Sequence, residues 1–298
     1  MNTKKIRAAK GEAAFYLINN IFLAVFFISV LYPIVYVLSA SISSPRAVMS
    51  GQVILWPVEL SLKGYEAAFR NSALLTGYAN SMIYAVVGTL FNVGITLTTG
   101  YALSRQELIG RQFFNLLFAF TMWFGGGLIP NYLLVRSLGI MNTRWAMWLP
   151  GMMSVWNMVL CRTYIRNTIP EELFEAVMMD GCGYFRFFTH IVLPLSGAII
   201  AVLAMFYAIG HWNAYFNAFI YLNNPALYPL QIILRDILIQ NQLEMEAVSE
   251  VTSSYADIGV VEVLKYAVIM LACLPLWIIY PFVQRFFVKG VMIGSLKG

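Results

Sequence analysis

The chain has 298 residues, of which 60% are hydrophobic and only 11% are charged, with a net charge of +5. An ordinary soluble domain has about 25% charged residues, so this chain has too little polar surface to coat a water-facing globule. Its basic residues are spread over short connecting segments and form no single stripe, which argues against nucleic-acid binding. The composition therefore predicts a protein that sits in the lipid bilayer.

Six windows without a charged residue divide the chain, and each is long enough, or nearly so, for the roughly 17–25 residues of a membrane helix. In chain order they are 13–45, 71–104, 112–135, 145–161, 187–234 and 266–284. The fifth window contains Asn223-Asn224-Pro225, which interrupts its apolar run, so we expect one helix in it rather than two. The sequence therefore predicts an all-α integral membrane protein with six transmembrane helices.

The distribution of Lys and Arg predicts the orientation. An even number of helices places both termini on one side of the membrane. With a cytoplasmic amino terminus, the inside segments hold twelve of the 19 basic residues, although they are the shorter in total. Basic residues accumulate on cytoplasmic loops, so both termini are predicted to be cytoplasmic. The first apolar run, 21–38, is longer than the roughly 7–15 residues of a signal-peptide core, which favours a retained helix over cleavage.

Polar residues and glycines interrupt the second and third windows. Asn92, Thr96 and Thr99 recur at helical spacing, and hydrogen bonds between helices are the favoured interpretation of this stripe. The glycines at 125–127 precede Pro130, which predicts a flexible or broken third helix. Such a break marks either a substrate path or a site of close helix packing, and the sequence leaves both open.

No enzyme or metal site is indicated. The three cysteines, Cys161, Cys182 and Cys273, have no paired spacing. The two histidines, His190 and His211, are predicted to lie near opposite membrane faces, so they form neither a metal site nor a catalytic dyad. The chain also lacks a G-x-x-x-x-G-K phosphate-binding motif, so any ATP must be handled by another chain.

The connection between the fourth and fifth predicted helices, about 166–194, is longer than two membrane helices require. Thr168 and Glu171 have the spacing of a capping box, and Gly181 suits the left-handed end of a helix. One face of this helix is expected to carry Leu173, Ala176, Val177 and Asp180. The segment is therefore predicted to be a helical elbow beneath the membrane, with an acidic first turn and a face suited to docking.

The sequence Glu175-Ala176-Val177, followed by Gly181 and by Ile191-Val192-Leu193-Pro194, resembles the EAA signature of binding-protein-dependent ABC importer permeases. Val177 stands where that family usually has alanine. Four further segments resemble the carbohydrate-uptake branch, within it the maltose-type permeases, and more closely those of complex-oligosaccharide importers: 125–130, 138–140, His211-Trp212-Asn213, and 289–294 with 297–298.

The resemblance implies a type I importer permease, with one transmembrane domain over 1–298 in the bacterial inner membrane. It implies four kinds of partner besides lipid: a second homologous permease subunit, two ATPase subunits that hold ATP and Mg²⁺, an extracellular solute-binding protein, and an oligosaccharide. It also implies that the chain is no enzyme and holds no cofactor. The residues that it assigns to the ATPase contact are Glu171, Glu172, Glu175, Ala176, Asp180 and Gly181.

The outer end of the fifth predicted helix carries the candidate substrate residues His211, Trp212, Asn213, Tyr215 and Asn217. Asn213 and Asn217 are expected to share a helical face, with aromatic rings beside them. This combination suits a sugar, whose hydroxyls pair with amides and whose C–H faces stack on rings. The alternative left open is that these side chains join helices to one another. The outer connection 221–262, with its six acidic residues, is expected to meet the binding protein.

Other functions remain as alternatives. A secondary transporter or channel predicts ionisable residues within the spans, and the predicted spans contain none besides His211 near an outer end. A membrane enzyme is disfavoured because no catalytic groups cluster. An ABC permease for a solute other than a sugar keeps the same architecture.

Overall fold

The computed structural model of the protein describes residues 10–247 and 255–295. Every regular element in this part of the chain is a helix, as the composition predicts. The chain divides into two compact units, Met1–Asn71 with Ile237–Ala272 and Ser72–Asp236 with Cys273–Gly298. The basic residues near the amino terminus, Lys4, Lys5 and Arg7, lie outside the described residues.

The first unit contains α1 (Lys10–Ser41), whose most apolar stretch has no buried residue. A helix that is apolar on all sides and uncovered by protein is suited to lipid. The unit also holds α2 (Pro45–Met49) and α3 (Lys63–Arg70). Among the side chains of α1 that the structure describes, from Phe15 onward, only those at its end are buried, and Ala40 joins Ala47, Val48, Val53 and Val263 in a small core.

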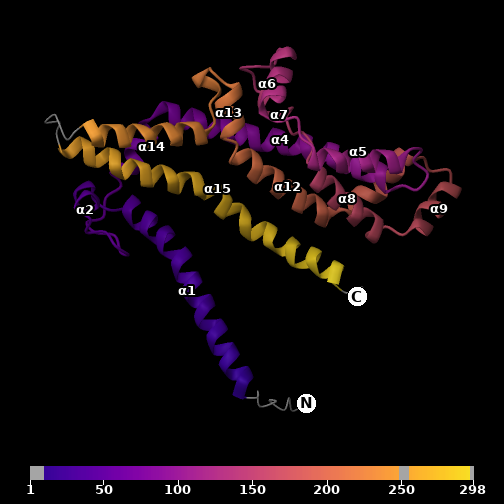
Figure 1. Ribbon diagram of the computed structural model, residues 1–298, viewed down its shortest axis with the longest axis horizontal. Coiled ribbons are helices and arrows are strands. Elements are labelled where there is room, and N and C mark those ends of the chain that lie inside the picture. The colour runs from indigo at the N-terminus through magenta and orange to yellow at the C-terminus, as the bar shows by residue number, and fades with distance from the viewer. Residues whose placement is uncertain (1–9, 248–254, 296–298) are drawn as a thin grey trace. The chain divides into compact units, whose positions relative to one another are not determined.

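The second unit is organised around α4 (Ser72–Ser104), along which α8 (Val155–Thr168) and α12 (Gly197–Trp212) pack (Figure 1). Small residues permit this close approach. A Cβ on Gly88 would clash with the imidazole of His211, and one on Gly100 would lie 2.8 Å from Cys161 Sγ. Glycine at helix crossings is a common device of membrane helices.

The third predicted helix is broken, which confirms the expectation from its glycines. It forms α5 (Arg111–Trp123) and α6 (Leu128–Ser137), which are bent by 115° relative to each other. Gly127, at the break, has a φ of 79°, a left-handed conformation that glycine adopts without strain.

The fourth window does not form one helix, contrary to the prediction. The short helix α7 (Trp145–Trp148) ends before Gly151, whose φ is 77°. Helix α8 then begins where the Ser154 hydroxyl accepts a hydrogen bond from the backbone N–H of Asn157 at 3.4 Å. The main helix is therefore shifted toward the carboxyl terminus and includes Arg162, because the serine cap, rather than the charge-free boundary, sets its start.

The fifth helix is reached through a bent approach. It comprises α10 (Tyr184–Phe187), a π-helical turn η1 (Phe188–Val192) and α11 (Leu193–Leu195). This approach is bent by 81° relative to α12. The bend places the elbow outside the line of the membrane helix.

The late connection is largely helical rather than the loop that the sequence predicts. After α13 (Phe216–Tyr221) and η2 (Pro225–Leu227), the chain forms α14 (Leu230–Ala247), and α15 (Tyr255–Ser295) begins soon afterwards. Leu230, Ile233 and Ile237 lie buried at helical spacing in α14, a periodicity that the prediction overlooked. Of the six acidic residues, only the side chains of Asp236 and Glu262 lie in the described part.

Polar side chains of α4 donate hydrogen bonds to the backbone at the start of this connection. Asn80 Nδ2 donates to the carbonyls of Ala226 and Tyr228 at 2.8 and 3.1 Å. The Tyr84 hydroxyl donates to the carbonyl of Leu227 at 2.8 Å. The irregular backbone of η2 is thereby satisfied within the protein, as a low-dielectric environment requires.

Three described helical segments are long and apolar enough to cross a membrane: Phe15–Ser41, Ser72–Ser104 and Gly259–Pro281. Two bent pairs, α5 with α6 and α10–α11 with α12, raise the number to five if each pair is one span. The described part of the chain is thus an all-helical membrane protein with three to five candidate spans.

The packing at Gly100 leads to a stability prediction. Alanine at this position places a Cβ 2.8 Å from Cys161 Sγ and 3.3 Å from the backbone nitrogen of Arg162. We expect Gly100→Ala to lower the free energy of unfolding by about 1–3 kcal/mol, as overpacking does. Gly94→Ala on the same helix is the control, because nothing lies within 4 Å of its Cβ. Equal thermal midpoints for the two purified variants would contradict this packing.

Candidate functional site

The elbow predicted from the sequence forms α9 (Glu171–Met179). Its two leading glutamates complement the positive end of the helix dipole. Gly181, just past its end, has a φ of 78°, which confirms the predicted left-handed termination. The capping box is not formed: Thr168 is already the last residue of α8, and Pro170 occupies the N-cap without a side-chain hydrogen bond.

The two sides of α9 have different surroundings. Phe174 is 4% exposed and lies in a core that also contains Phe187 and Ile165. Leu173 and Val177 pack against the same core, so the face predicted for docking is only partly free. The assigned coupling residues that remain exposed are Glu172, Glu175, Ala176, Asp180 and Gly181.

Glu171 differs from the other coupling residues because it has a partner within the chain. Its Oε1 lies 3.6 Å from Nη1 of Arg105, which directly follows α4 and whose side chain is 4% exposed. The guanidinium also lies over three rings, with its Cζ 4.9 Å from the centroid of Phe174, 5.7 Å from that of Tyr101 and 5.9 Å from that of Phe187. The sequence analysis assigns Arg105 no role, although its position directly after a long apolar helix is a usable signal.

The polar stripe of α4 meets polar groups of other segments within the second unit. Asn92 Oδ1 lies 3.2 Å from Nε2 of His211, and Asn92 Nδ2 donates to the carbonyl of Gly151 at 3.3 Å. The hydroxyls of Thr96 and Tyr207 are 2.7 Å apart. Asn92 and Thr96 thus form the interhelical bonds that the sequence favoured, and the imidazole of His211 is engaged between helices.

The outer end of the fifth helix differs from the prediction. Helix α12 ends at Trp212, Asn213 occupies its C-cap, and a new helix begins at Phe216. Asn213 and Asn217 therefore do not share a face of one continuous helix, because the helix breaks between them. Trp212 is buried, and its ring lies edge-on to Tyr78 with centroids 5.4 Å apart. The side chain of Asn213 is exposed.

An arginine that the sequence reading missed lies over the aromatic residues of this region. The rings of Tyr215 and Phe219 are stacked, with centroids 5.8 Å apart. Arg235 of α14 lies over both, its Cζ 4.7 Å from the Phe219 centroid and 5.7 Å from that of Tyr215. Its Nη1 is 3.6 Å from Oδ1 of Asp236, and its side chain is 38% exposed. A partly exposed guanidinium on stacked rings can recognise a carboxylate.

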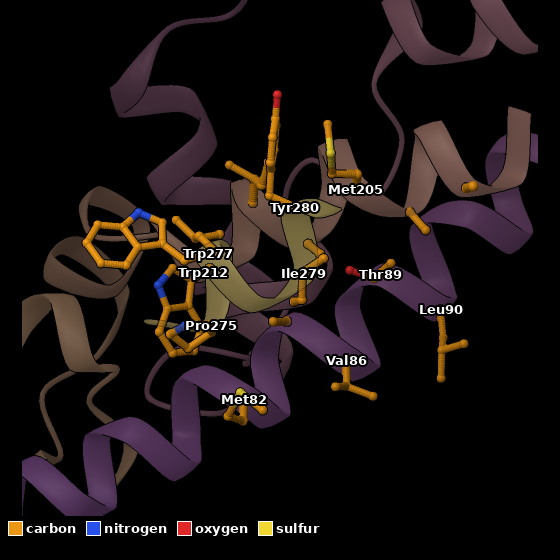
Figure 2. A pocket seen from close by; sticks show the side chains of 16 residues that line it. Met82, Val86, Thr89, Leu90, Met205, Trp212, Pro275, Trp277, Ile279 and Tyr280 are labelled. Carbon is orange, nitrogen blue, oxygen red and sulfur yellow. The ribbon is translucent and has the colours of Figure 1, made fainter. Parts of the chain in front are cut away.

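A cavity of about 580 Å³ lies among α4, α12 and α15 within the second unit (Figure 2). Figure 2 shows the rings of Trp212 and Trp277 together at one end, while Met82, Val86 and Leu90 follow one another along α4. The lining is mostly apolar, which suits hydrocarbon better than sugar hydroxyls. Trp212 thus lines an apolar cavity.

No metal centre accompanies these features in the described residues, where no group of three or more His, Cys, Asp or Glu side chains could hold an ion.

No family model matches the chain. It is similar to the polygalacturonan/rhamnogalacturonan transport system permease protein YtcP of Bacillus subtilis (strain 168), with 37% identity over 277 residues, which cover 93% of this chain and 96% of that protein. It is also similar to the protein LplC of the same strain, with 34% identity over 294 residues and 97% of each chain covered. A solved bacterial ABC transporter involved in the import of the acidic polysaccharide alginate matches with a TM-score of 0.85 and 31% identity, covering 95% of this chain and 100% of that chain.

Proposed function

The chain belongs to the carbohydrate-uptake family of ABC importer permeases, and we propose from this membership that it carries an oligosaccharide across the bacterial cell membrane. Permease subunits of ABC importers are non-catalytic transmembrane components, so the chain holds neither a catalytic residue nor a cofactor. The observation that carries the proposal is the similarity to carbohydrate permeases over nearly the whole chain, and α9 agrees with it as an elbow that presents Glu175 and Ala176 on an exposed face.

The proposed complex contains four further subunits. A second homologous permease completes the pore, two ATPase subunits bind ATP and Mg²⁺ in the cytoplasm, and an extracellular binding protein delivers the sugar. Within this chain, a single permease domain over 1–298 crosses the membrane six times with both termini cytoplasmic. The three candidate spans and the two bent pairs support five of these crossings, and we assign the sixth to the segment that contains α8. The elbow at about 166–194 then faces the ATPases.

The exposed side of α9 is the proposed ATPase contact, with Glu172, Glu175, Ala176, Asp180 and Gly181 as its residues. Its carboxylates suit a partly basic cleft, and its alanine permits close approach. Glu171 belongs to the same helix but also contacts Arg105, so its role lies partly within the permease.

Charge reversal at Glu175 tests the proposed function. We expect Glu175→Lys to abolish sugar uptake and the stimulation of ATP hydrolysis by the loaded binding protein, because a like charge opposes docking. Membrane insertion is expected to stay normal. Glu107→Lys is the matched control, since Glu107 is exposed and belongs to another cytoplasmic connection in the proposed topology. Normal uptake by Glu175→Lys would contradict the assignment.

Asn213, Tyr215 and Asn217 are the proposed sugar contacts, with His211 and Trp212 supporting them from within the bundle. The exposure of Asn213 supports this division, because its amide remains accessible, whereas His211 is bonded to Asn92 and Trp212 is buried. The break between α12 and α13 also leaves backbone polar groups near these side chains.

Replacement of Asn213 tests this contact. We expect Asn213→Ala to raise the sugar concentration needed for half-maximal uptake by about fivefold or more, as loss of a hydrogen bond does. Expression and basal ATP hydrolysis serve as controls. A lower thermal midpoint with normal uptake per folded transporter would show that Asn213 only stabilises the helix end.

An acidic oligosaccharide is the substrate class that these features support best. The solved neighbour takes part in the import of the acidic polysaccharide alginate, and the position of Arg235 over two stacked rings suits a sugar ring that bears a carboxylate. Asp236 already balances part of the positive charge of Arg235. The carboxylate of a bound sugar therefore replaces Asp236 as the partner of the guanidinium.

The role of Arg235 predicts a selective defect. We expect Arg235→Gln to reduce uptake of alginate oligosaccharides by about tenfold or more, because a charge-assisted hydrogen bond is lost. Uptake of a neutral oligosaccharide of equal length is expected to be unaffected in the same proteoliposomes if the wild type transports it. An equal loss for both sugars, or none for the acidic one, would exclude carboxylate recognition by Arg235.

A further inference from the structure

The cytoplasmic end of α4 carries a buried cation. Arg105 is the one charged residue that is buried among the described residues. A guanidinium removed from water is costly unless opposite charge and polarisable groups surround it. The groups around Arg105 therefore indicate which helices its charge holds together.

These surroundings come from three helices. Tyr101 belongs to α4, Glu171 and Phe174 belong to α9, and Phe187 belongs to α10. Glu171 approaches Nη1 of Arg105 to 3.6 Å, while the three rings lie within 6 Å of its Cζ. Arginine suits this position better than lysine, because its planar group stacks on rings while keeping its charge.

We propose that Arg105 is a positioning residue that clamps α9 to α4, so that ATPase-driven movement of the elbow reaches the transmembrane helices. The inference rests on the proposed function. Helix α9 has the geometry for this role, because Glu175 is exposed while Phe174 and Glu171 face Arg105. A force applied to the exposed side is thereby transmitted to α4.

Helix α4 passes the movement on. Its Asn92 and Thr96 are bonded to His211 and Tyr207 of α12, the helix that leads to the proposed sugar contacts. One end of α4 is thus tied to the elbow, and its middle is tied to the helix beside the pathway. If the contacts of Arg105 with α9 are removed, α9 moves with the ATPase but no longer moves α4 and α12.

The test measures ATP consumed per sugar imported. Complete transporters carrying Arg105→Gln, Arg105→Lys, Glu171→Gln or Phe174→Leu are placed in proteoliposomes with a labelled alginate oligosaccharide and its binding protein. We expect Arg105→Gln to raise the ATP-to-sugar ratio about fivefold or more. Glu171→Gln and Phe174→Leu are expected to raise it less, since each removes one contact. Arg105→Lys is expected to keep part of the coupling that Arg105→Gln loses, because lysine retains the ion pair with Glu171.

Matched controls separate positioning from folding. Glu107→Gln and Arg166→Lys change exposed residues by the same chemistry and should keep the wild-type ratio. A purely structural role lowers uptake and hydrolysis together and leaves their ratio unchanged. A wild-type ratio in the assembled fraction of Arg105→Gln and Glu171→Gln transporters therefore overturns the inference, whether or not assembly is reduced. If the unaltered transporter imports no sugar, the proposed function fails instead.

Discussion

Polar side chains on α4 need partners within the protein, because hydrocarbon offers none. This constraint organises the second unit. Asn80 binds the connection that follows α13, Asn92 and Thr96 bind α12 and the turn before α8, and Arg105 binds the elbow. These contacts join α4 to the connection after α13, to α12, to the turn before α8 and to the elbow, so one helix positions these four segments relative to one another.

The two sides of α9 have different surroundings, which suit the two tasks proposed for the elbow. The exposed carboxylates of α9 are available to a partner, whereas Phe174 and Glu171 are engaged by the permease itself. An importer needs this division, because ATP is hydrolysed on one subunit and the sugar moves through another. In the proposed clamp, the contacts of Phe174 and Glu171 with Arg105 make the elbow move as one body with α4.

Much of this could be read from the sequence, and the errors have physical causes. Charge-free windows located the long helices, glycines at 125–127 located the break, and Gly181 located the end of the elbow. The edges of the charge-free windows did not match the helix ends in two places. At Ser154 a local cap sets the start of the helix, and in α14 buried isoleucines favour a helix although the segment carries charges. The pairing of Arg105 with Glu171 joins residues far apart in the chain, so no local pattern could reveal it.

The most direct test of this organisation measures whether α4 and α9 move as one body. Spin labels at Thr98 and Met179, both exposed, report the distance between the two helices by electron–electron resonance in the complete transporter. If Arg105 clamps the elbow, the distance distribution stays the same in the nucleotide-free and the ATP-bound transporter. A shift of the distribution, or a second population that appears only with ATP, would show that α9 moves independently of α4 and would contradict the clamp.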